Sequence, residues 1–213
     1  MKCGKEIMGL YAVTDRAWVG RQTLYHQVEA ALKGGVTCVQ LREKELGEDA
    51  FLQEAREIAP LCRAYGVPFF INDNVEVALA CHADGIHVGQ EDLAAGQVRQ
   101  RVGEDMMIGV SVHSVAEALD AVNQGADYLG VGAMFTTSTK ADAAVVSMET
   151  LREICAAVEI PVVAIGGIGR DNMTRLIGTG VDGVALVSAI FAAEDIEKEC
   201  RQLRKLSEEM VKA

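Results

Sequence analysis

The chain has 213 residues, of which 50% are hydrophobic and 5% aromatic, and its formal net charge at pH 7 is −11. This length and apolar content suffice for one well-buried core, and we expect a single domain over residues 1–213. The excess of acidic groups argues against nonspecific binding to nucleic acid or to an anionic membrane. Basic residues that bind a phosphate must therefore be concentrated locally, and a bound cation would offset the repulsion.

Neither a membrane span nor a secretory signal is expected. No run reaches the roughly 18 apolar residues that a spanning helix needs, and the basic start at residues 1–6 leads into no apolar signal core. Six cysteines lack short pair spacing, which favours reduced thiols over disulfides or a zinc site. We therefore expect a cytoplasmic protein whose partners are small molecules, and the sequence leaves open whether it forms a homo-oligomer.

In chain order, short β-branched runs alternate with helical patterns from end to end. We predict eight strands, at residues 9–15, 38–44, 68–73, 85–90, 107–113, 128–134, 161–168 and 183–190. Apolar residues at three- and four-residue spacing predict helices between them, among them 24–33, 49–65, 115–124 and 148–158. Eight such units in a chain of this length predict a single-domain (β/α)8 TIM barrel, and an open doubly wound sheet is the alternative.

Short sequence signals mark the turns between these elements. A glycine suited to a left-handed helix cap begins three similar units, Gly35-Val-Thr37, Gly125-Ala-Asp127 and Gly180-Val-Asp182. This weak repeat fits one βα unit used again around a closed structure. The predicted N-caps of later helices are Ser114, Ser147 and Asp171.

In a barrel, residues at the C-terminal ends of the strands converge on one mouth. The residues gathered there would be Gln40, Arg42, Lys44, Asn72, Asp73, Asp92, Ser111, His113, Gly132, Gly166, Gly167 and Ser188. Among them, Asp73 and Asp92 follow neighbouring strands, and two carboxylates with water and substrate phosphate suit Mg²⁺. The alternative for either aspartate is a cap on the helix that follows it.

The second strand ends in Gln40-Leu-Arg-Glu-Lys44. Alternation along the strand puts Gln40, Arg42 and Lys44 on one side, where an amide and two cations could bind a phosphorylated ligand. The alternative is a barrel interior in which the basic residues form a salt bridge to Glu43. His87, inside the fourth strand, is read as a core histidine whose hydrogen bonds are satisfied.

A second phosphate-binding region is predicted away from the metal. The loops after strands seven and eight are the usual phosphate site of such barrels, and Gly166, Gly167 and Ser188 lie there. The hydroxyl-rich loop 135–140 is a weaker candidate, and tight turns and a flexible loop are the alternatives. Two regions can hold a diphosphate ester beside a monophosphate, which suggests joining them with loss of pyrophosphate. The sequence contains no P-loop or dinucleotide motif, and no nucleophile–base pair stands out.

Eight segments in order resemble thiamine-phosphate synthase. They are QLREK (40–44), IND (71–73), ADGIHVGQED (83–92), GVSVH (109–113), ADYLGVG (126–132), TSTK (137–140), VAIGGI (163–168) and VSAI (187–190). The resemblance implies a barrel-shaped transferase of thiamine biosynthesis. It would join 4-amino-2-methyl-5-hydroxymethylpyrimidine pyrophosphate to 4-methyl-5-(2-phosphooxyethyl)thiazole, forming thiamine phosphate and pyrophosphate.

The same resemblance implies roles for individual residues. Contacts to the pyrimidine pyrophosphate would come from Gln40, Leu41, Arg42, Glu43, Lys44, Asn72, Ser111 and Lys140, with Arg42, Lys44, Ser111 and Lys140 as the catalytic residues. The metal ligands for Mg²⁺ would be Asp73 and Asp92. The thiazole phosphate would be held by Thr137, Ser138, Thr139, Gly167, Val187 and Ser188. The C–O bond would break first, giving a pyrimidine-stabilised carbocation that the thiazole nitrogen captures.

The chain departs from the family pattern where proline is usual, at Ala94, Ala133 and Thr136. We therefore expect a less rigid loop after the sixth strand. Two other functions stay open. One is a thiazole tautomerase on the same barrel, with His113 as its acid–base group and no metal. The other is a non-catalytic protein that binds thiamine phosphate.

Overall fold

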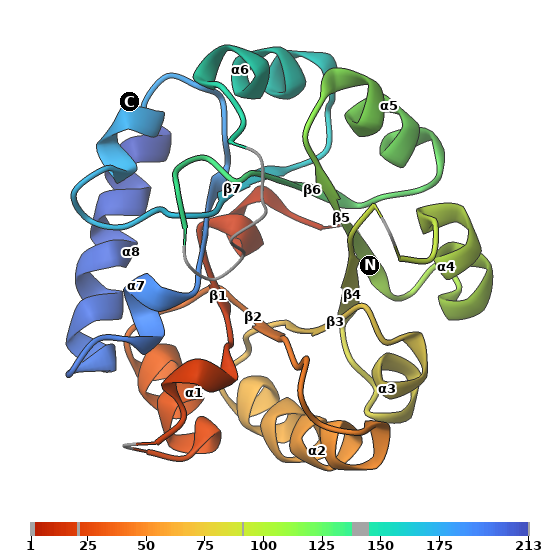
Figure 1. Ribbon diagram of the computed structural model, residues 1–213, viewed down its shortest axis with the longest axis vertical. Helices are drawn as coiled ribbons and strands as arrows, with labels where there is room; N and C mark the ends of the chain where they lie inside the picture. Colours follow the sequence, from red (N-terminus) through yellow and green to blue (C-terminus); the bar gives the residue numbers. More distant parts are fainter. Residues whose placement is uncertain (1–2, 21, 91, 138–144, 213) are drawn as a thin grey trace.

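The computed structural model describes residues 3–20, 22–90, 92–137 and 145–212. Its eight parallel strands close into one barrel in chain order, with β1 paired to both β2 and β8 (Figure 1). The strands are β1 Leu10–Val13, β2 Cys38–Leu41, β3 Phe69–Asn72, β4 Gly85–Val88, β5 Met107–Val112, β6 Tyr128–Val131, β7 Val162–Ile165 and β8 Gly183–Leu186. The predicted (β/α)8 barrel is confirmed, and the open sheet is excluded.

Helices form the outer ring around the strands in Figure 1. They are α1 Leu24–Lys33, α2 Glu48–Ala64, α3 Val75–Ala80, α4 Ala95–Val102, α5 Val115–Asn123, α6 Met148–Ala157, α7 Ser188–Phe191 and α8 Ile196–Lys212, with short 3₁₀ turns η1 Lys5–Met8, η2 Arg16–Trp18 and η3 Met173–Leu176. The four predicted helices agree with α1, α2, α5 and α6 to within one residue at each end. None of the helices in the described part of the chain is long and apolar enough to cross a membrane.

The strands are shorter than predicted at their C-terminal ends. β2 stops at Leu41 and β3 at Asn72, so the polar residues that follow leave the ladder and turn over the mouth. The largest difference is at β8, which ends at Leu186 although a strand was predicted to residue 190. There the backbone N–H groups of Ile190 and Phe191 donate to the carbonyl of Val187, which turns the chain into α7.

Two of the three predicted N-caps are confirmed. Ser114 accepts a hydrogen bond from the Glu117 N–H at the start of α5, and Ser147 accepts one from the Thr150 N–H at the start of α6. The prediction for Asp171 is wrong, because only the turn η3 follows and Asn172 precedes it. The Asn172 side chain is bonded to the loop after β7 instead, which holds this segment against the strand end.

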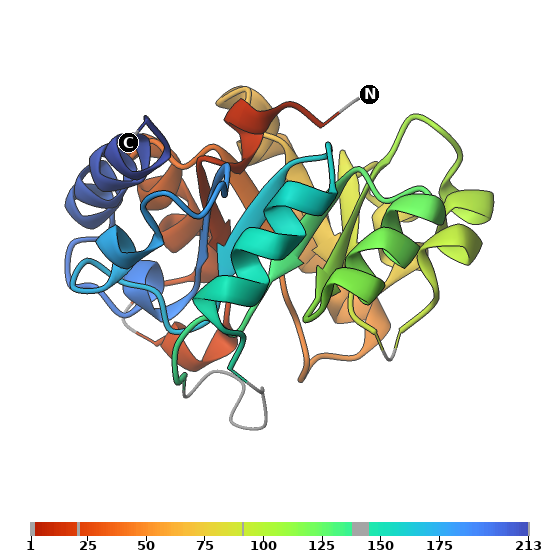
Figure 2. The same ribbon diagram turned by 90° about the horizontal axis from the view of Figure 1, so that it is seen from above.

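The repeated unit seen in the sequence has a structural cause. Thr37 Oγ1 accepts from the Leu10 N–H at 2.8 Å, Asp127 Oδ2 from the Ile108 N–H at 2.8 Å, and Asp182 Oδ2 from the Val162 N–H at 2.9 Å. Each bond ties the turn that enters one strand to the start of the strand before it. The units therefore fasten the N-terminal end of the barrel, where η1 lies (Figure 2).

Aromatic side chains fill the barrel interior on the N-terminal side of the mouth. Tyr11, Phe70 and Tyr128 are at most 1% exposed, and the Phe70 and Tyr128 rings meet edge to face with centroids 5.5 Å apart. Two glycines make room for them. A Cβ atom on Gly85 would lie 2.1 Å from Phe70 Cε1, and one on Gly109 would lie 2.1 Å from Tyr128 Cζ. Because this end is packed, the cavity that the described residues form inside the barrel lies toward the mouth.

Candidate active site

A cavity of about 810 Å³ opens at the C-terminal ends of the strands, and residues from all eight strands or the loops after them line it. Of the residues predicted for the site, the lining includes Gln40, Arg42, Lys44, Asn72, Asp73, Asp92, Ser111, Thr137, Gly167, Val187 and Ser188. The other three predicted residues of the loop after β6, Ser138, Thr139 and Lys140, lie outside the described residues. The fold thus brings residues up to about 150 positions apart in sequence into one cavity.

The alternation predicted after β2 places an amide and two cations on the cavity side. Gln40 Nε2 donates to Tyr11 Oη at 2.7 Å, and Arg42 Nη1 lies 2.9 Å from Asp15 Oδ2. Lys44 Nζ donates to Asp73 Oδ2. The alternative salt bridge from these bases to Glu43 is not what the structure shows, since each base has another acidic partner.

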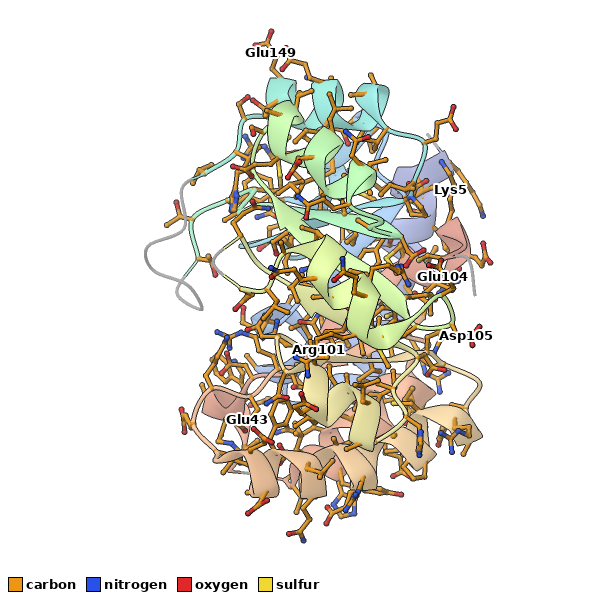
Figure 3. The ribbon with its side chains drawn as sticks, turned by 90° about the vertical axis from the view of Figure 1, so that its right-hand side faces the viewer. Lys5, Glu43, Arg101, Glu104, Asp105 and Glu149 are labelled. Carbon is orange, nitrogen blue, oxygen red and sulfur yellow. The ribbon has the colours of Figure 1, made fainter. Side chains whose placement is uncertain are left out.

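Leu41 and Glu43 were also expected to contact substrate, and the structure turns both side chains away from the cavity. Leu41 is fully buried in the layer between strands and helices. Glu43 accepts from Arg16 Nε at 2.6 Å and from the backbone N–H groups of Glu45 and Leu46. Figure 3 shows Glu43 at the mouth end of the barrel beside α2, whereas Lys5, Glu104 and Asp105 lie at the opposite end. Neither side chain lines the cavity, because strand alternation turns both outward.

Asp73 and Asp92 lie together at the mouth and do not cap helices. The N-cap of α3 is Asn74, whose side chain accepts from the Val77 N–H, and the N-cap of α4 is Ala94. Asp73 has a positive φ of 62°, uncommon for a residue with a side chain and often associated with functional sites. Asp92 Oδ2 accepts from the Gly89 N–H at 2.8 Å. The capping alternative is therefore excluded for both aspartates.

The electrostatics of the pair depend on burial and on Lys44. Burial raises the pKa of Asp73, the hydrogen bond and charge of Lys44 oppose that rise, and the neighbouring Asp92 adds to it. Among the described residues, no group of three or more His, Cys, Asp or Glu side chains could form a complete metal cage. A pair of carboxylates open to a cavity is instead the donor set that suits Mg²⁺, which keeps several waters and binds substrate phosphates.

The loops after β6 and β7 are bonded to each other. The Met134 N–H donates to the Ile165 carbonyl at 2.9 Å, and the Phe135 N–H donates to the Gly166 carbonyl at 3.0 Å. Gly167 has a φ of 65°, and a Cβ atom on it would lie 2.6 Å from the Thr136 carbonyl oxygen. Only glycine fits this close approach, so Gly167 brings its backbone to the cavity between the two loops.

The structure shows the backbone at two of the three positions that lack a family proline, Ala94 and Ala133. Ala94 has a φ of −56°, a value that proline also adopts. The carbonyl of Ala133 accepts from the Val146 N–H at 2.8 Å, which joins the two described ends of the loop after β6. The backbone contacts of Met134, Phe135 and Gly167 therefore position the described part of this loop without those prolines.

Sequence reasoning missed Tyr11, which lines the cavity, and Tyr128, which is hydrogen-bonded to it. Their hydroxyl oxygens are 2.8 Å apart, and His87 Nδ1 lies 2.9 Å from Tyr128 Oη. The interpretation of His87 as a satisfied core histidine is confirmed, because its Nε2 also lies 2.9 Å from Ser111 Oγ and burial lowers its pKa to about 4. Polar aromatic residues at inward positions of otherwise apolar strands were the available signal.

A histidine–carboxylate pair also lines the cavity. His113 Nδ1 lies 3.1 Å from Glu117 Oε2, and the same oxygen accepts from the His113 backbone N–H at 2.7 Å. The sequence singled out His113 but not its partner, which is the fourth residue further along the chain. A carboxylate that orients an imidazole is a common arrangement for an acid–base group.

Known proteins resemble this chain over nearly its whole length. The family model described as thiamine monophosphate synthase matches residues 10–190. A thiamine-phosphate synthase of Clostridium acetobutylicum is 48% identical over 192 residues, covering 90% of this chain and 91% of that protein. One of Enterococcus faecalis is 45% identical over 209 residues, covering 98% and 99%. The solved structure of a thiamine phosphate pyrophosphorylase from Pyrococcus furiosus aligns with a TM-score of 0.90 at 41% identity, covering 97% and 98%.

Proposed function

Because this chain belongs to the thiamine monophosphate synthase family, we propose that it joins two phosphorylated heterocycles within the mouth cavity. The substrates are 4-amino-2-methyl-5-hydroxymethylpyrimidine pyrophosphate and 4-methyl-5-(2-phosphooxyethyl)thiazole. A bond forms between the thiazole nitrogen and the pyrimidine methylene carbon, and the bond from that carbon to the pyrophosphate oxygen breaks. Pyrophosphate leaves with the electron pair, and thiamine phosphate is the other product.

The observation that carries this proposal is the contact between Lys44 and Asp73, with Asp92 beside them, in one cavity. Neither aspartate caps a helix, so both are available to a ligand. Asp73 and Asp92 would hold Mg²⁺, which when bound would neutralise part of the charge on a diphosphate. A pair of this kind would have no role in a site that binds only a monophosphate.

The chain's own cations act on the leaving group. Arg42 and Lys44 both line the cavity beside the aspartates, where they can bind diphosphate oxygens and stabilise the negative charge that develops as the C–O bond breaks. Lys140, outside the described residues, would add a third cation. Cleavage before bond formation needs no strong protein base, since the thiazole nitrogen attacks with its own lone pair. Asn72 and Ser111 would orient the pyrimidine, so that the methylene carbon faces the nucleophile.

The thiazole phosphate would bind on the opposite side of the cavity. Gly167, Val187 and Ser188 line it there, and the loop after β6 approaches with Thr137. Ser138 and Thr139 would complete this group. The backbone N–H groups at the start of α7 and the hydroxyl of Ser188 are suitable donors to phosphate oxygens. This separation keeps the two phosphorylated groups apart and brings the reacting atoms toward the centre.

One observation favours a second candidate, the thiazole tautomerase. His113 is oriented by Glu117 at the cavity wall, as an acid–base group would be. Such an enzyme would bind a single thiazole phosphate and would leave Asp73, Asp92 and the cations after β2 without a ligand. The synthase reaction uses all of these groups. A non-catalytic binding protein would likewise not need the aspartate pair.

One assay separates the three functions. Both substrates are mixed with the protein, with Mg²⁺ or with EDTA, and the release of pyrophosphate and the isomerisation of the thiazole are measured together. We expect pyrophosphate and thiamine phosphate to form in equal amounts only when Mg²⁺ is present. Isomerisation without pyrophosphate would support the tautomerase, and binding of thiamine phosphate without either reaction would support the binding protein.

A further inference from the structure

A continuous chain of hydrogen bonds crosses the barrel interior beneath the cavity. It runs from Gln40 Nε2 to Tyr11 Oη at 2.7 Å, on to Tyr128 Oη at 2.8 Å, then to His87 Nδ1 at 2.9 Å and from His87 Nε2 to Ser111 Oγ at 2.9 Å. Both end residues line the cavity, as do Tyr11 and His87. The three residues between them are at most 8% exposed, so their polar groups depend on one another.

Counting the available protons gives the direction in which hydrogen bonds are donated along this series. A phenol has one proton to donate, and a neutral imidazole has one N–H and one acceptor nitrogen. The Gln40 amide donates to Tyr11. When each group donates to the next, Tyr11 donates to Tyr128 and Tyr128 donates to His87 Nδ1. His87 must then carry its proton on Nε2 and donate it to Ser111 Oγ. The Ser111 proton is thereby free to point toward the cavity, while Gln40 keeps Oε1 as an acceptor and the second hydrogen of Nε2 as a donor.

We propose that Tyr11, Tyr128 and His87 are positioning residues that couple the hydrogen-bonding character of Gln40 to that of Ser111. In this arrangement Gln40 donates to Tyr11 and Ser111 accepts from His87, which leaves the Ser111 hydroxyl proton available to a ligand. Turning the Gln40 amide over, so that Oε1 accepts from Tyr11, would reverse every bond, and Ser111 would then donate its proton to His87. The orientation of the Gln40 amide therefore decides whether the Ser111 proton is available to the cavity, although the two residues are 71 positions apart.

This coupling has a consequence for substrate recognition, and that consequence rests on the proposed function. The site would select a heterocycle that presents a donor to Gln40 and an acceptor to Ser111. An aminopyrimidine carries both, in its amino group and its ring nitrogens. A ring that presents a donor to Ser111 would face the serine proton and lose that hydrogen bond. Sites that hydrogen-bond their ligand reject the wrong ligand by such losses.

The direct test needs no substrate and reads the tautomer of His87. The ring nitrogens of the four histidines are labelled with ¹⁵N, and the His87 signals are identified by their loss in His87→Asn. We expect the wild-type ring to be protonated on Nε2. Gln40→Glu, recorded at about pH 8 so that the new carboxyl group is an ionised acceptor, should move the proton to Nδ1. A wild-type ring protonated on Nδ1, or an unchanged tautomer in Gln40→Glu, would overturn the proposal.

Interrupting the hydrogen-bond chain at Tyr128 supplies the matched control. Tyr128→Phe and the double variant Gln40→Glu/Tyr128→Phe should show the same His87 tautomer, because no path joins the two ends. A tautomer that still responds to Gln40 in the Tyr128→Phe background would contradict coupling through Tyr128. If Gln40→Glu does not fold, the wild-type spectrum alone decides the direction of donation along the hydrogen bonds.

A kinetic measurement tests whether the hydrogen-bond chain contributes to binding of the pyrimidine substrate. Tyr128→Phe should raise the KM for the pyrimidine substrate by about threefold to tenfold, since Ser111 is no longer oriented, and should leave the KM for the thiazole unchanged. Tyr65→Phe, at an exposed tyrosine that ends α2, is the control for losing a hydroxyl. An unchanged pyrimidine KM would refute the recognition role. Failure of the wild-type protein to release pyrophosphate would refute the proposed function, and the tautomer measurement would still stand.

Discussion

Lys44 Nζ donates a hydrogen bond to Asp73 Oδ2 across the ends of β2 and β3. The lysine side chain is 53% exposed, so the contact lies at the open mouth and can be exchanged when a ligand enters. An anionic diphosphate would compete with Asp73 for this ammonium group, and a cation would compete with Lys44 for the carboxylate. The pair thus holds complementary groups in place for both ligands.

Replacing Lys44 tests this exchange. Lys44→Met keeps the aliphatic stem and removes the charge, and we expect pyrophosphate release to fall by at least about 100-fold, the usual cost of losing a group that stabilises transition-state charge. The melting temperature should change little, because exposed ion pairs contribute little to stability. Lys205→Met on α8 is the control. Near-normal turnover in Lys44→Met would remove this lysine from the mechanism.

The raised pKa of Asp73 predicts a pH dependence of stability. A carboxyl group whose folded pKa lies above its unfolded value binds its proton more tightly in the native state. The metal-free fold therefore loses stability as pH rises through the carboxyl range, and Asp73→Asn removes this loss. In EDTA at neutral pH, Asp73→Asn should melt at a higher temperature than wild type. The difference should shrink in acid, where the wild-type carboxyl group is protonated.

Thermal melts of Asp73→Asn, wild type and Asp171→Asn across this pH range check the prediction. Asp171 is exposed beyond β7 and serves as the matched control. A lower melting temperature for Asp73→Asn at neutral pH would mean that its contact with Lys44 outweighs the cost of burying the carboxylate.

Asp92 offers the clearest test of the metal assignment. Asp92→Ala should abolish Mg²⁺-dependent pyrophosphate release while leaving the fold intact, because Asp92 caps no helix and follows β4 at the cavity. Mg²⁺ at about 100 times its Kd would stabilise the wild-type fold by about 2.7 kcal/mol through mass action. The rise in melting temperature on adding Mg²⁺ should be lost in the variant. Unchanged turnover, or an unchanged response to Mg²⁺, would refute the assignment.

The sequence predicts the barrel because each βα unit carries its own local signals. Period-2 and period-3.6 patterns identify the elements, and residues at the C-terminal strand ends must then meet at the mouth. Asp73, Asp92 and the alternating residues after β2 could be placed in one cavity for this reason. The outward orientation of the Leu41 and Glu43 side chains also follows from alternation.

The partners of these residues could not be predicted in the same way. Tyr11 and Tyr128 are separated by 117 positions, and nothing local connects them. Similarly, Arg42 pairs with Asp15 rather than with the adjacent Glu43. The end of β8 was also missed, because the run 183–190 is apolar enough for a strand. Its turn into α7 depends on bonds back to the Val187 carbonyl.

The packing of Tyr128 predicts a large effect at Gly109. A Cβ atom at this position would lie 2.1 Å from Tyr128 Cζ, so Gly109→Ala must displace the ring within a filled interior. Overpacking of this kind costs about 1–3 kcal/mol. Chemical denaturation should show that loss, whereas Gly20→Ala should be near neutral because nothing lies within 4 Å of the added atom. Equal stabilities for the two variants would show that the barrel interior is not tightly packed around Tyr128.

Asn172 predicts a separation between the two substrates. Its Nδ2 donates to the Gly167 carbonyl at 2.8 Å, and its Oδ1 accepts from the Gly169 N–H at 2.9 Å, so it fixes the loop proposed to bind the thiazole phosphate. Asn172→Ala should raise the KM for the thiazole phosphate by about fivefold to tenfold, since two hydrogen bonds to backbone are lost. The KM for the pyrimidine should not change, because that substrate is proposed to bind beside β2 to β5. Asn123→Ala, at the exposed end of α5, should affect neither KM. Equal increases for both substrates in Asn172→Ala would mean that the two phosphorylated groups do not occupy separate sides of the cavity.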